Sequence, residues 1–176
     1  MSTKRQYRTF DKQNEALDFT FSYNDEETAA LHTQLNNSSA ITENELRRVS
    51  LWKSNRVLSV PPATLEKLNA LATIPNISLK DPLVKDVIDQ LVLAQGIGFP
   101  MASSILKFIR PDLFPIIDVR AYRALTGTKP YYGTYNYKKY IAYAEQLTDL
   151  ARQLNRPLRE IDEQLYCYDE KHNGKI

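Results

Sequence analysis

The chain has 176 residues, with 23 basic and 21 acidic side chains and a formal net charge of +2. This length suits one compact domain that buries a hydrophobic core, and so small a net charge does not by itself indicate a nucleic-acid partner. No segment approaches the roughly 18 consecutive apolar residues of a membrane span, so we expect a soluble protein without membrane contact.

Cysteine and histidine are scarce, which limits the chemistry of the chain. A single cysteine, Cys167, excludes an internal disulfide, a four-cysteine iron–sulfur cluster and a four-cysteine zinc site. The two histidines, His32 and His172, leave little material for a catalytic metal centre. We therefore expect no cofactor and no metal ion held by side chains. The polar N-terminus lacks the apolar core of a secretory signal, which predicts a cytosolic location.

The spacing of apolar residues predicts a mostly helical, all-α protein. Apolar side chains recur at intervals of three and four, and only five glycines interrupt the chain. Residues 1–25 differ, because "YRTF" and "LDFTFSYND" cluster aromatic and β-branched residues. We expect a short strand pair or an extended, wrapping arm there. The whole chain, residues 1–176, is predicted to be one domain, and two helical lobes around a cleft are also compatible with its length.

Local signals mark where the helices begin. Thr42 and Glu45 form a capping-box pattern that opens a helix over residues 43–58. Asp81 precedes a proline and an apolar stripe, which predicts another helix start. The other expected helices cover about residues 25–35, 62–74, 82–94, 99–109, 118–125, 137–155 and 157–172.

The four residues from Gln95 to Gly98 separate two of these helices. Glycine tolerates positive φ and lets another backbone or a phosphate come close, so Gly96 and Gly98 predict a tight hairpin. The second helix begins with unpaired N–H groups, and together these features predict an anion site made of backbone atoms. A glycine turn between two packed helices is an equally good explanation of this stretch taken alone.

The helix after the hairpin is expected to be amphipathic. Its apolar residues fall at i, i+3, i+4 and i+7 between Ala102 and Ile109. Ser103, Ser104 and Lys107 lie between them, so we expect these three side chains to point away from the buried face.

A proline-containing loop, "RPDLFP", leads to a single aspartate. The apolar pair Ile116-Ile117 comes directly before Asp118 and should be buried, and the following "VRAYRAL" is predicted to be helical. Asp118 then lies at or near the N-cap of that helix, and a capping role alone accounts for an aspartate at this position.

Hairpin, loop and aspartate together resemble the helix-hairpin-helix DNA glycosylases, in particular their endonuclease III-like members. The interval of 22 residues between the first hairpin glycine and the aspartate matches that of these members. The resemblance implies the helix-hairpin-helix glycosylase fold in a short, single-domain bacterial form, located in the bacterial cytosol. The residues that match the family pattern are Gly96, Ile97, Gly98, Ala102, Ile117, Asp118 and Arg123.

Three positions depart from that pattern. Pro100 stands where bifunctional members carry the lysine that forms a Schiff base, which implies a monofunctional enzyme whose strand cleavage is slow or left to another enzyme. Gln95 replaces the proline before the first glycine, and Arg120 stands at the position of the family's histidine. Arg120 would act either on the aspartate or on a phosphate. The four cysteines of some relatives are absent, in line with a protein that uses no iron–sulfur cofactor.

The resemblance implies that the protein flips a damaged or modified base out of double-stranded DNA and hydrolyses its N-glycosidic bond. Asp118 would be the catalytic residue, stabilising the oxocarbenium-like sugar while an abasic site forms. A monovalent cation at the hairpin carbonyls is a further implication. The expected DNA contacts are Gly96, Ile97, Gly98, Lys107, Arg120 and Arg123.

Aromatic residues supply the candidates for the base pocket. Tyr131, Tyr132 and Tyr135 surround a glycine and are expected to stack on a base. Trp52 is a further candidate, for which packing in the core is the favoured explanation. Tyrosines at helical spacing from 137 to 143 are expected to belong to the core. The base is either a damaged one, in DNA repair and base excision, or a hypermodified one such as glucosylated hydroxymethylcytosine, in defence against phage.

Two other classes of function fit the same residues. A non-catalytic helix-hairpin-helix module would bind DNA and use Asp118 only as a helix cap. A protein-interaction or regulatory domain would have lost the DNA contact altogether. Base release that depends on the Asp118 carboxylate separates the enzyme from both.

Overall fold

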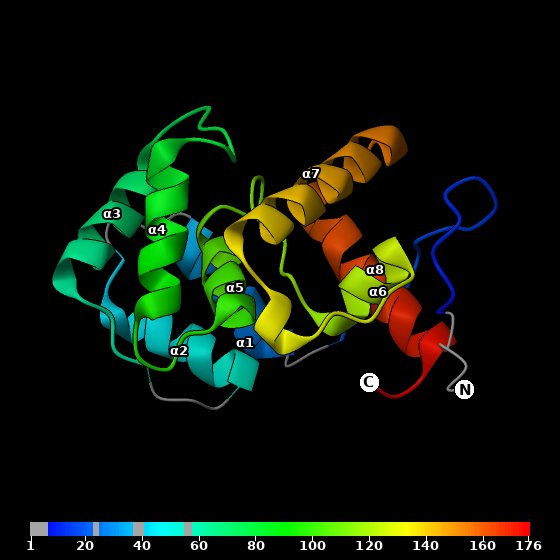
Figure 1. The fold of residues 1–176 in the computed structure, drawn as a ribbon, viewed down its shortest axis with the longest axis horizontal. Coiled ribbons are helices and arrows are strands. Elements are labelled where there is room, and N and C mark those ends of the chain that lie inside the picture. The colour runs from blue at the N-terminus through cyan, green and yellow to red at the C-terminus, as the bar shows by residue number, and fades with distance from the viewer. Residues whose placement is uncertain (1–6, 23–24, 37–40, 55–57) are drawn as a thin grey trace. The chain divides into compact units, whose positions relative to one another are not determined.

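The structure is a computed structural model that describes residues 7–22, 25–36, 41–54 and 58–176 (Figure 1). These residues form eight α-helices and one 3₁₀ turn, with no β-strand among them, which confirms the all-α prediction. The chain divides into two compact units. Residues 22–116 form one, called the hairpin unit, and residues 1–21 with 117–176 form the other, called the aspartate unit.

The hairpin unit is built around its last helix, α5, which contacts three of the other four helices, namely α1, α2 and α4. Helix α3 packs beside α4, and the two lie side by side in Figure 1. The bounds are Asp25–Asn36 for α1, Glu43–Ser54 for α2, Pro62–Thr73 for α3, Pro82–Leu93 for α4 and Phe99–Ile109 for α5.

The helix starts follow the predicted caps. The backbone N–H of Thr42 donates to a carboxylate oxygen of Glu45 at 2.9 Å, as in a capping box. Asp81 caps α4 by accepting from the Leu83 N–H at 2.8 Å. Helix α2 is described as far as Ser54, and positions 55–57 of the predicted helix lie outside the described residues.

Helix α5 is buried on all sides, so the expectation of an amphipathic helix was wrong. Every residue from Phe99 to Ile109 except Pro100 is buried, including Ser103, Ser104 and Lys107. The physical reason is its central position, because three helices surround it. The hydroxyls of both serines donate to the Pro100 carbonyl, at 2.9 and 2.8 Å, which offsets the cost of burying them.

In the aspartate unit, α8 packs against both α6 and α7. A buried ion pair joins α6 to α8: Arg123 Nε donates to Asp169 Oδ1 at 2.8 Å, and Arg123 Nη2 donates to Oδ2 at 2.5 Å. The side chains are 1% and 0% exposed. The bounds are Val119–Thr126 for α6, Tyr132–Thr134 for the 3₁₀ turn η1, Tyr137–Leu154 for α7 and Leu158–Asn173 for α8.

The N-terminal segment is an extended arm rather than a strand pair over its described residues, 7–22. The N–H of Phe10 donates to the carbonyl of Ala124 at the end of α6, at 3.0 Å. The hydroxyl of Tyr168 on α8 donates to the Thr9 carbonyl, also at 3.0 Å. The arm therefore contacts α6 through a backbone hydrogen bond and α8 through the Tyr168 side chain, and both bonds satisfy polar backbone groups of the arm.

We predict that Asp169→Ala lowers the free energy of unfolding by about 3–5 kcal/mol, because it leaves the Arg123 guanidinium buried without its counter-charge. Chemical denaturation measures the change. The matched control is Asp149→Ala, which removes the partner of Arg152 in a pair that is 59% and 74% exposed and should cost less than about 1 kcal/mol. Equal losses in the two variants would contradict the assigned importance of the buried pair.

Candidate functional site

The hairpin turn joins α4 to α5 in the conformation that its glycines allow. Gly96 has a φ of +79°, in the left-handed region that other residues rarely adopt. Gly98 is the extended N-cap residue of α5. The Gln95 carbonyl accepts from the Ser59 N–H at 3.1 Å, which holds the outer side of the turn. Ile97 is buried and anchors the turn in the core of the hairpin unit.

Two backbone donors of this turn are uncommitted. The N–H groups of Gly96 and Gly98 donate to no acceptor among the described residues. They lie directly before the N-terminus of α5, where the helix dipole favours an anion. The predicted phosphate contacts at Gly96 and Gly98 therefore have the donors they require, supplied by backbone rather than by side chains.

Two of the predicted basic contacts lie inside the protein. Lys107 is 2% exposed and Arg123 is 1% exposed. Lys107 lies on the central helix of its unit, and Arg123 is bonded to Asp169, so in this conformation neither presents its charge to solvent. We therefore leave both out of the proposed DNA contacts.

Arg120 is engaged with the end of α8. Its guanidinium pairs with Asp169 at 3.4 Å and with Glu170 at 3.6 Å, and it donates to the Gly174 carbonyl at 3.1 Å. It also lies 5.5 Å from the centre of the Tyr166 ring. These contacts assign Arg120 a structural role beside the buried ion pair.

Asp118 is the N-cap residue of α6, as predicted. Its Oδ1 accepts from the Ala121 N–H at 2.8 Å. Its other carboxylate oxygen, Oδ2, accepts no hydrogen bond from the described residues, and the side chain is half-buried. Ile117, directly before it, is fully buried, so the backbone at this point is anchored. The cap therefore orients the carboxylate and leaves one oxygen available.

Tyrosines gather beside this carboxylate in what we call the tyrosine cluster, made of Tyr122, Tyr132, Tyr135, Tyr143 and Lys139. Tyr122, one turn after Asp118, stacks on Tyr143 of α7 with ring centres 5.7 Å apart. The Lys139 ammonium lies 5.0 Å from the ring of Tyr122 and 5.4 Å from that of Tyr135. Tyr132 meets Tyr135 edge-on at 6.3 Å.

Tyr135 carries a buried hydroxyl without a hydrogen-bond partner among the described residues. Burial raises the pKa of Tyr135, and the negative charge of Asp118 raises it further. The charge of Asp118 also contributes to the raised pKa of Tyr143, so the carboxylate lies close enough to act on both phenols. Tyr135 therefore stays protonated through the neutral range and keeps a donor to offer.

The other base-pocket candidates occupy different environments. Tyr131 is the N-cap residue of η1 and Tyr132 its first residue, and the two are 75% and 63% exposed. Trp52 belongs to the core of the hairpin unit, where its Nε1–H donates to the Thr28 hydroxyl at 2.8 Å. Its ring meets Phe108 edge-on at 5.1 Å. The core explanation that the sequence left open for Trp52 is the one that the structure supports.

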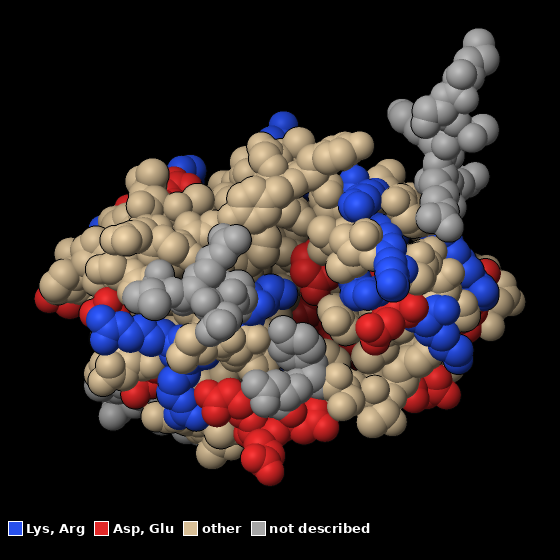
Figure 2. Space-filling view, turned by 90° about the horizontal axis from the view of Figure 1, so that it is seen from below, with Lys and Arg blue, Asp and Glu red and all other residues tan. Residues whose placement is uncertain are grey.

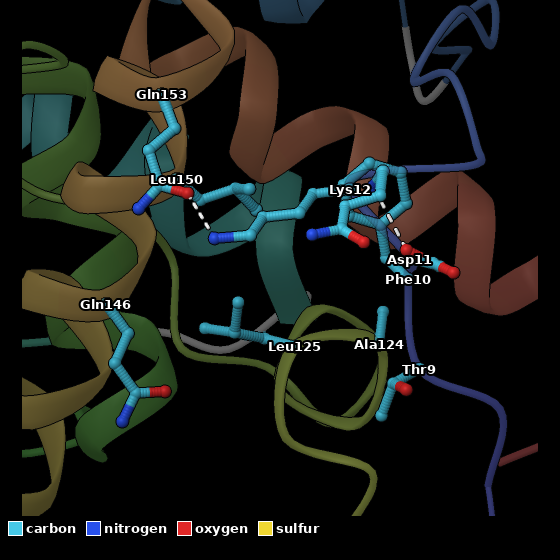
Figure 3. A pocket seen from close by; sticks show the side chains of 10 residues that line it. Thr9, Phe10, Asp11, Lys12, Ala124, Leu125, Gln146, Leu150 and Gln153 are labelled. Atoms are coloured by element: carbon cyan, nitrogen blue, oxygen red, sulfur yellow. Dashed lines mark hydrogen bonds between the residues drawn. The ribbon is translucent and has the colours of Figure 1, made fainter.

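Sequence reasoning missed a groove of about 490 Å³ in the aspartate unit (Figure 3). The arm from Thr9 to Gln13 forms one side, and the end of α6 and the residues of α7 from Gln146 to Gln153 form the rest. Lys12 reaches across it and donates to the Gln153 side chain. No sequence signal pointed to this groove, because it depends on where the arm packs.

Charge is mixed over the surface. Basic and acidic side chains intersperse on the face drawn in Figure 2. On α2, Arg47 pairs with Glu43 and Arg48 with Glu27. Over the described part of the chain, no helix is long and apolar enough to cross a membrane, and no group of three or more His, Cys, Asp or Glu side chains is placed to hold a metal ion.

No family model, curated protein or solved structure matches this chain. Its function is therefore argued from the two features described above, the hairpin turn and the aspartate with its tyrosines.

We predict that Gly96→Ala lowers the free energy of unfolding by about 1–2 kcal/mol, because alanine is strained at a φ of +79°. Gly133→Ala is the control, since a Cβ added there meets no atom within 4 Å and its φ lies outside the left-handed region. That change should be neutral or slightly stabilising. Urea titration of both variants tests the turn geometry, and a wild-type midpoint for Gly96→Ala would contradict it.

Proposed function

We propose that this protein is a monofunctional DNA glycosylase that hydrolyses the N-glycosidic bond of a damaged or modified nucleotide and leaves an abasic site. The observation that carries the proposal is Asp118, with one oxygen fixed by the α6 cap. Among the described residues, its other oxygen and the buried Tyr135 hydroxyl in its field have no hydrogen-bond partner. An available carboxylate beside aromatic rings and an unused donor suits the binding of a flipped nucleoside.

In the proposed reaction the bond between C1′ and the base nitrogen breaks, and its electron pair leaves with the base. Positive charge then develops on the sugar, and the ionised Asp118 stabilises it through the uncommitted oxygen. A water molecule adds to C1′ and gives up a proton, and the departing base takes one up. The products are an abasic site and the free base.

The tyrosine cluster would hold the base. Ring faces bind any nucleobase by stacking, and the Tyr135 hydroxyl would donate to an acceptor on the base beside the glycosidic bond. The amides of Gly96 and Gly98 would bind the phosphate backbone without reading the sequence. Pro100 has no amine, so no lysine is expected to cut the strand from that position.

Two kinds of base are compatible with this chemistry. A damaged base places the protein in base excision repair, and a hypermodified base, such as glucosylated hydroxymethylcytosine, places it in defence against phage. Duplex DNA panels carrying each kind of base separate the two.

We predict that Asp118→Asn slows base release at least about 100-fold, measured by mass spectrometry of the free base. Asparagine caps helices as well as aspartate does, so α6 should persist and the loss should reflect the missing charge. The matched control is Asp81→Asn, the same substitution at the N-cap of α4, which should leave base release unchanged.

A second function, non-catalytic DNA binding, is favoured by one observation, the capping bond from Ala121 to Asp118. A binding module would need the aspartate only for that bond. Binding of DNA by wild type and by Asp118→Asn, with no base released by either, would replace the glycosylase proposal with this one.

We further predict that Tyr135→Phe slows base release by about 2- to 10-fold, because a single neutral hydrogen bond to the base is lost. The same change should keep or raise the free energy of unfolding, by up to about 1 kcal/mol, since it removes a buried hydroxyl without a partner. Kinetics and thermal unfolding of one sample test both parts. Lower stability with unchanged kinetics would show that the hydroxyl serves the fold.

A further inference from the structure

The segment that follows α6 combines tyrosines and lysines without any acid. From Gly127, directly after α6, to Ala144 the sequence contains no aspartate or glutamate. Within it, six tyrosines and three lysines fall between residues 129 and 143. Aromatic side chains interleaved with cations are the composition of surfaces that bind single-stranded nucleic acids. The glycosylase proposal uses the tyrosine cluster and leaves the exposed Tyr131, Lys129 and Lys138 of this segment unexplained.

The two most exposed tyrosines of the segment are held on a fixed turn. Tyr131 and Tyr132 are 75% and 63% exposed, whereas Tyr140 and Tyr143 of the same segment are buried. The N–H and the hydroxyl of Thr134 both donate to the Tyr131 carbonyl, at 2.9 and 2.7 Å. These bonds close η1, so the two rings are presented to solvent from an ordered backbone, and binding them costs little conformational entropy.

The lysines of the segment have no acidic partner among the described residues. This holds for Lys129 and Lys138, which are exposed, and for Lys139. By contrast, Arg120 and Arg123 are paired with acids on α8. Lys139 is oriented by the Thr134 hydroxyl, to which its ammonium donates at 2.8 Å. Three cations without an acidic partner, close in sequence to two exposed rings, are complementary to a polyanion.

We propose that residues 129–139 form a platform that binds an unpaired DNA strand, with bases stacked on Tyr131 and Tyr132 and phosphates held by Lys129 and Lys138. DNA as the polymer rests on the proposed function. The single strand follows from the geometry, because an exposed ring stacks only on a base whose face is open, and bases inside a duplex cover one another. The platform deepens the proposed function by naming its substrate class: DNA with unpaired nucleotides at the target.

The test is the affinity for a fluorescent 15-nucleotide deoxythymidine oligomer, alone and annealed to its complement, at one fixed salt concentration. Wild type should bind the single strand more tightly than the duplex. Tyr131→Ala/Tyr132→Ala should weaken single-strand binding at least about 10-fold, whereas Tyr131→Phe/Tyr132→Phe keeps the rings and should stay within about 2-fold of wild type. The control is Leu51→Ala, which removes an exposed apolar side chain from α2 and should change nothing.

Each outcome decides the proposal. Wild-type affinity in the double alanine variant overturns it, as does equal affinity of wild type for the duplex and the single strand. If the phenylalanine variant loses affinity for the single strand, the tyrosine hydroxyls make the contacts and the stacking proposal is overturned. Polyglutamate is the second probe. If the double alanine variant binds polyglutamate more weakly than wild type does but binds DNA equally well, the surface binds an acidic protein partner and the DNA proposal is overturned.

The design also separates this proposal from the glycosylase. The oligomer carries no modified base, so its binding requires no catalysis, and Asp118→Asn should bind it as wild type does. If that variant abolishes base release while the alanine variant binds DNA normally, the glycosylase proposal stands and the platform fails. If neither protein releases base while the platform binds as expected, the platform stands and the glycosylase proposal fails.

Discussion

The aspartate unit depends on one buried ion pair. Arg123 and Asp169 are removed from water and bonded to each other by two hydrogen bonds, and Asn173 donates to the same carboxylate at 2.8 Å. A charge buried this deeply is tolerated only with its partner in place, so the pair sets where α6 meets α8. Asp118 begins α6, and the pair that holds this helix therefore also holds the carboxylate that the proposed chemistry needs.

Close to that carboxylate, the aspartate unit contains a buried polar group that is not hydrogen-bonded by the described residues. A buried hydroxyl without a hydrogen bond costs free energy, and the Tyr135 hydroxyl has no partner in the described part of the chain. Proteins tolerate such defects mainly at functional sites, where a ligand satisfies the group that the fold leaves open. The Asp118 carboxylate has a similar arrangement: its hydrogen bond from the Ala121 N–H fixes its direction and leaves its second oxygen available. Both features favour a site over a purely structural helix start.

Local signals in the sequence predicted the elements well. The caps at Thr42, Asp81 and Asp118 are short-range features, formed by residues two or three apart, and all three occur as expected. The glycine hairpin is also local, because a left-handed φ at Gly96 is a property of the residue itself. The exposure of individual side chains was predicted less well. Lys107 lies on a helix whose central position depends on three other helices, so periodicity within its own sequence did not report its burial.

The sequence by itself therefore determined the all-helical class, the helix starts, the hairpin turn and the position of Asp118 as a cap, since each of these depends on neighbours along the chain. Tertiary structure alone decided that Arg123 is a buried partner of Asp169, that the Tyr135 hydroxyl is buried near Asp118 and that Tyr131 and Tyr132 are exposed. It also decided where the arm packs and hence where the groove of Figure 3 lies. The reason is physical: burial and charge pairing are set by residues far apart in sequence, and one-dimensional spacing carries no record of them.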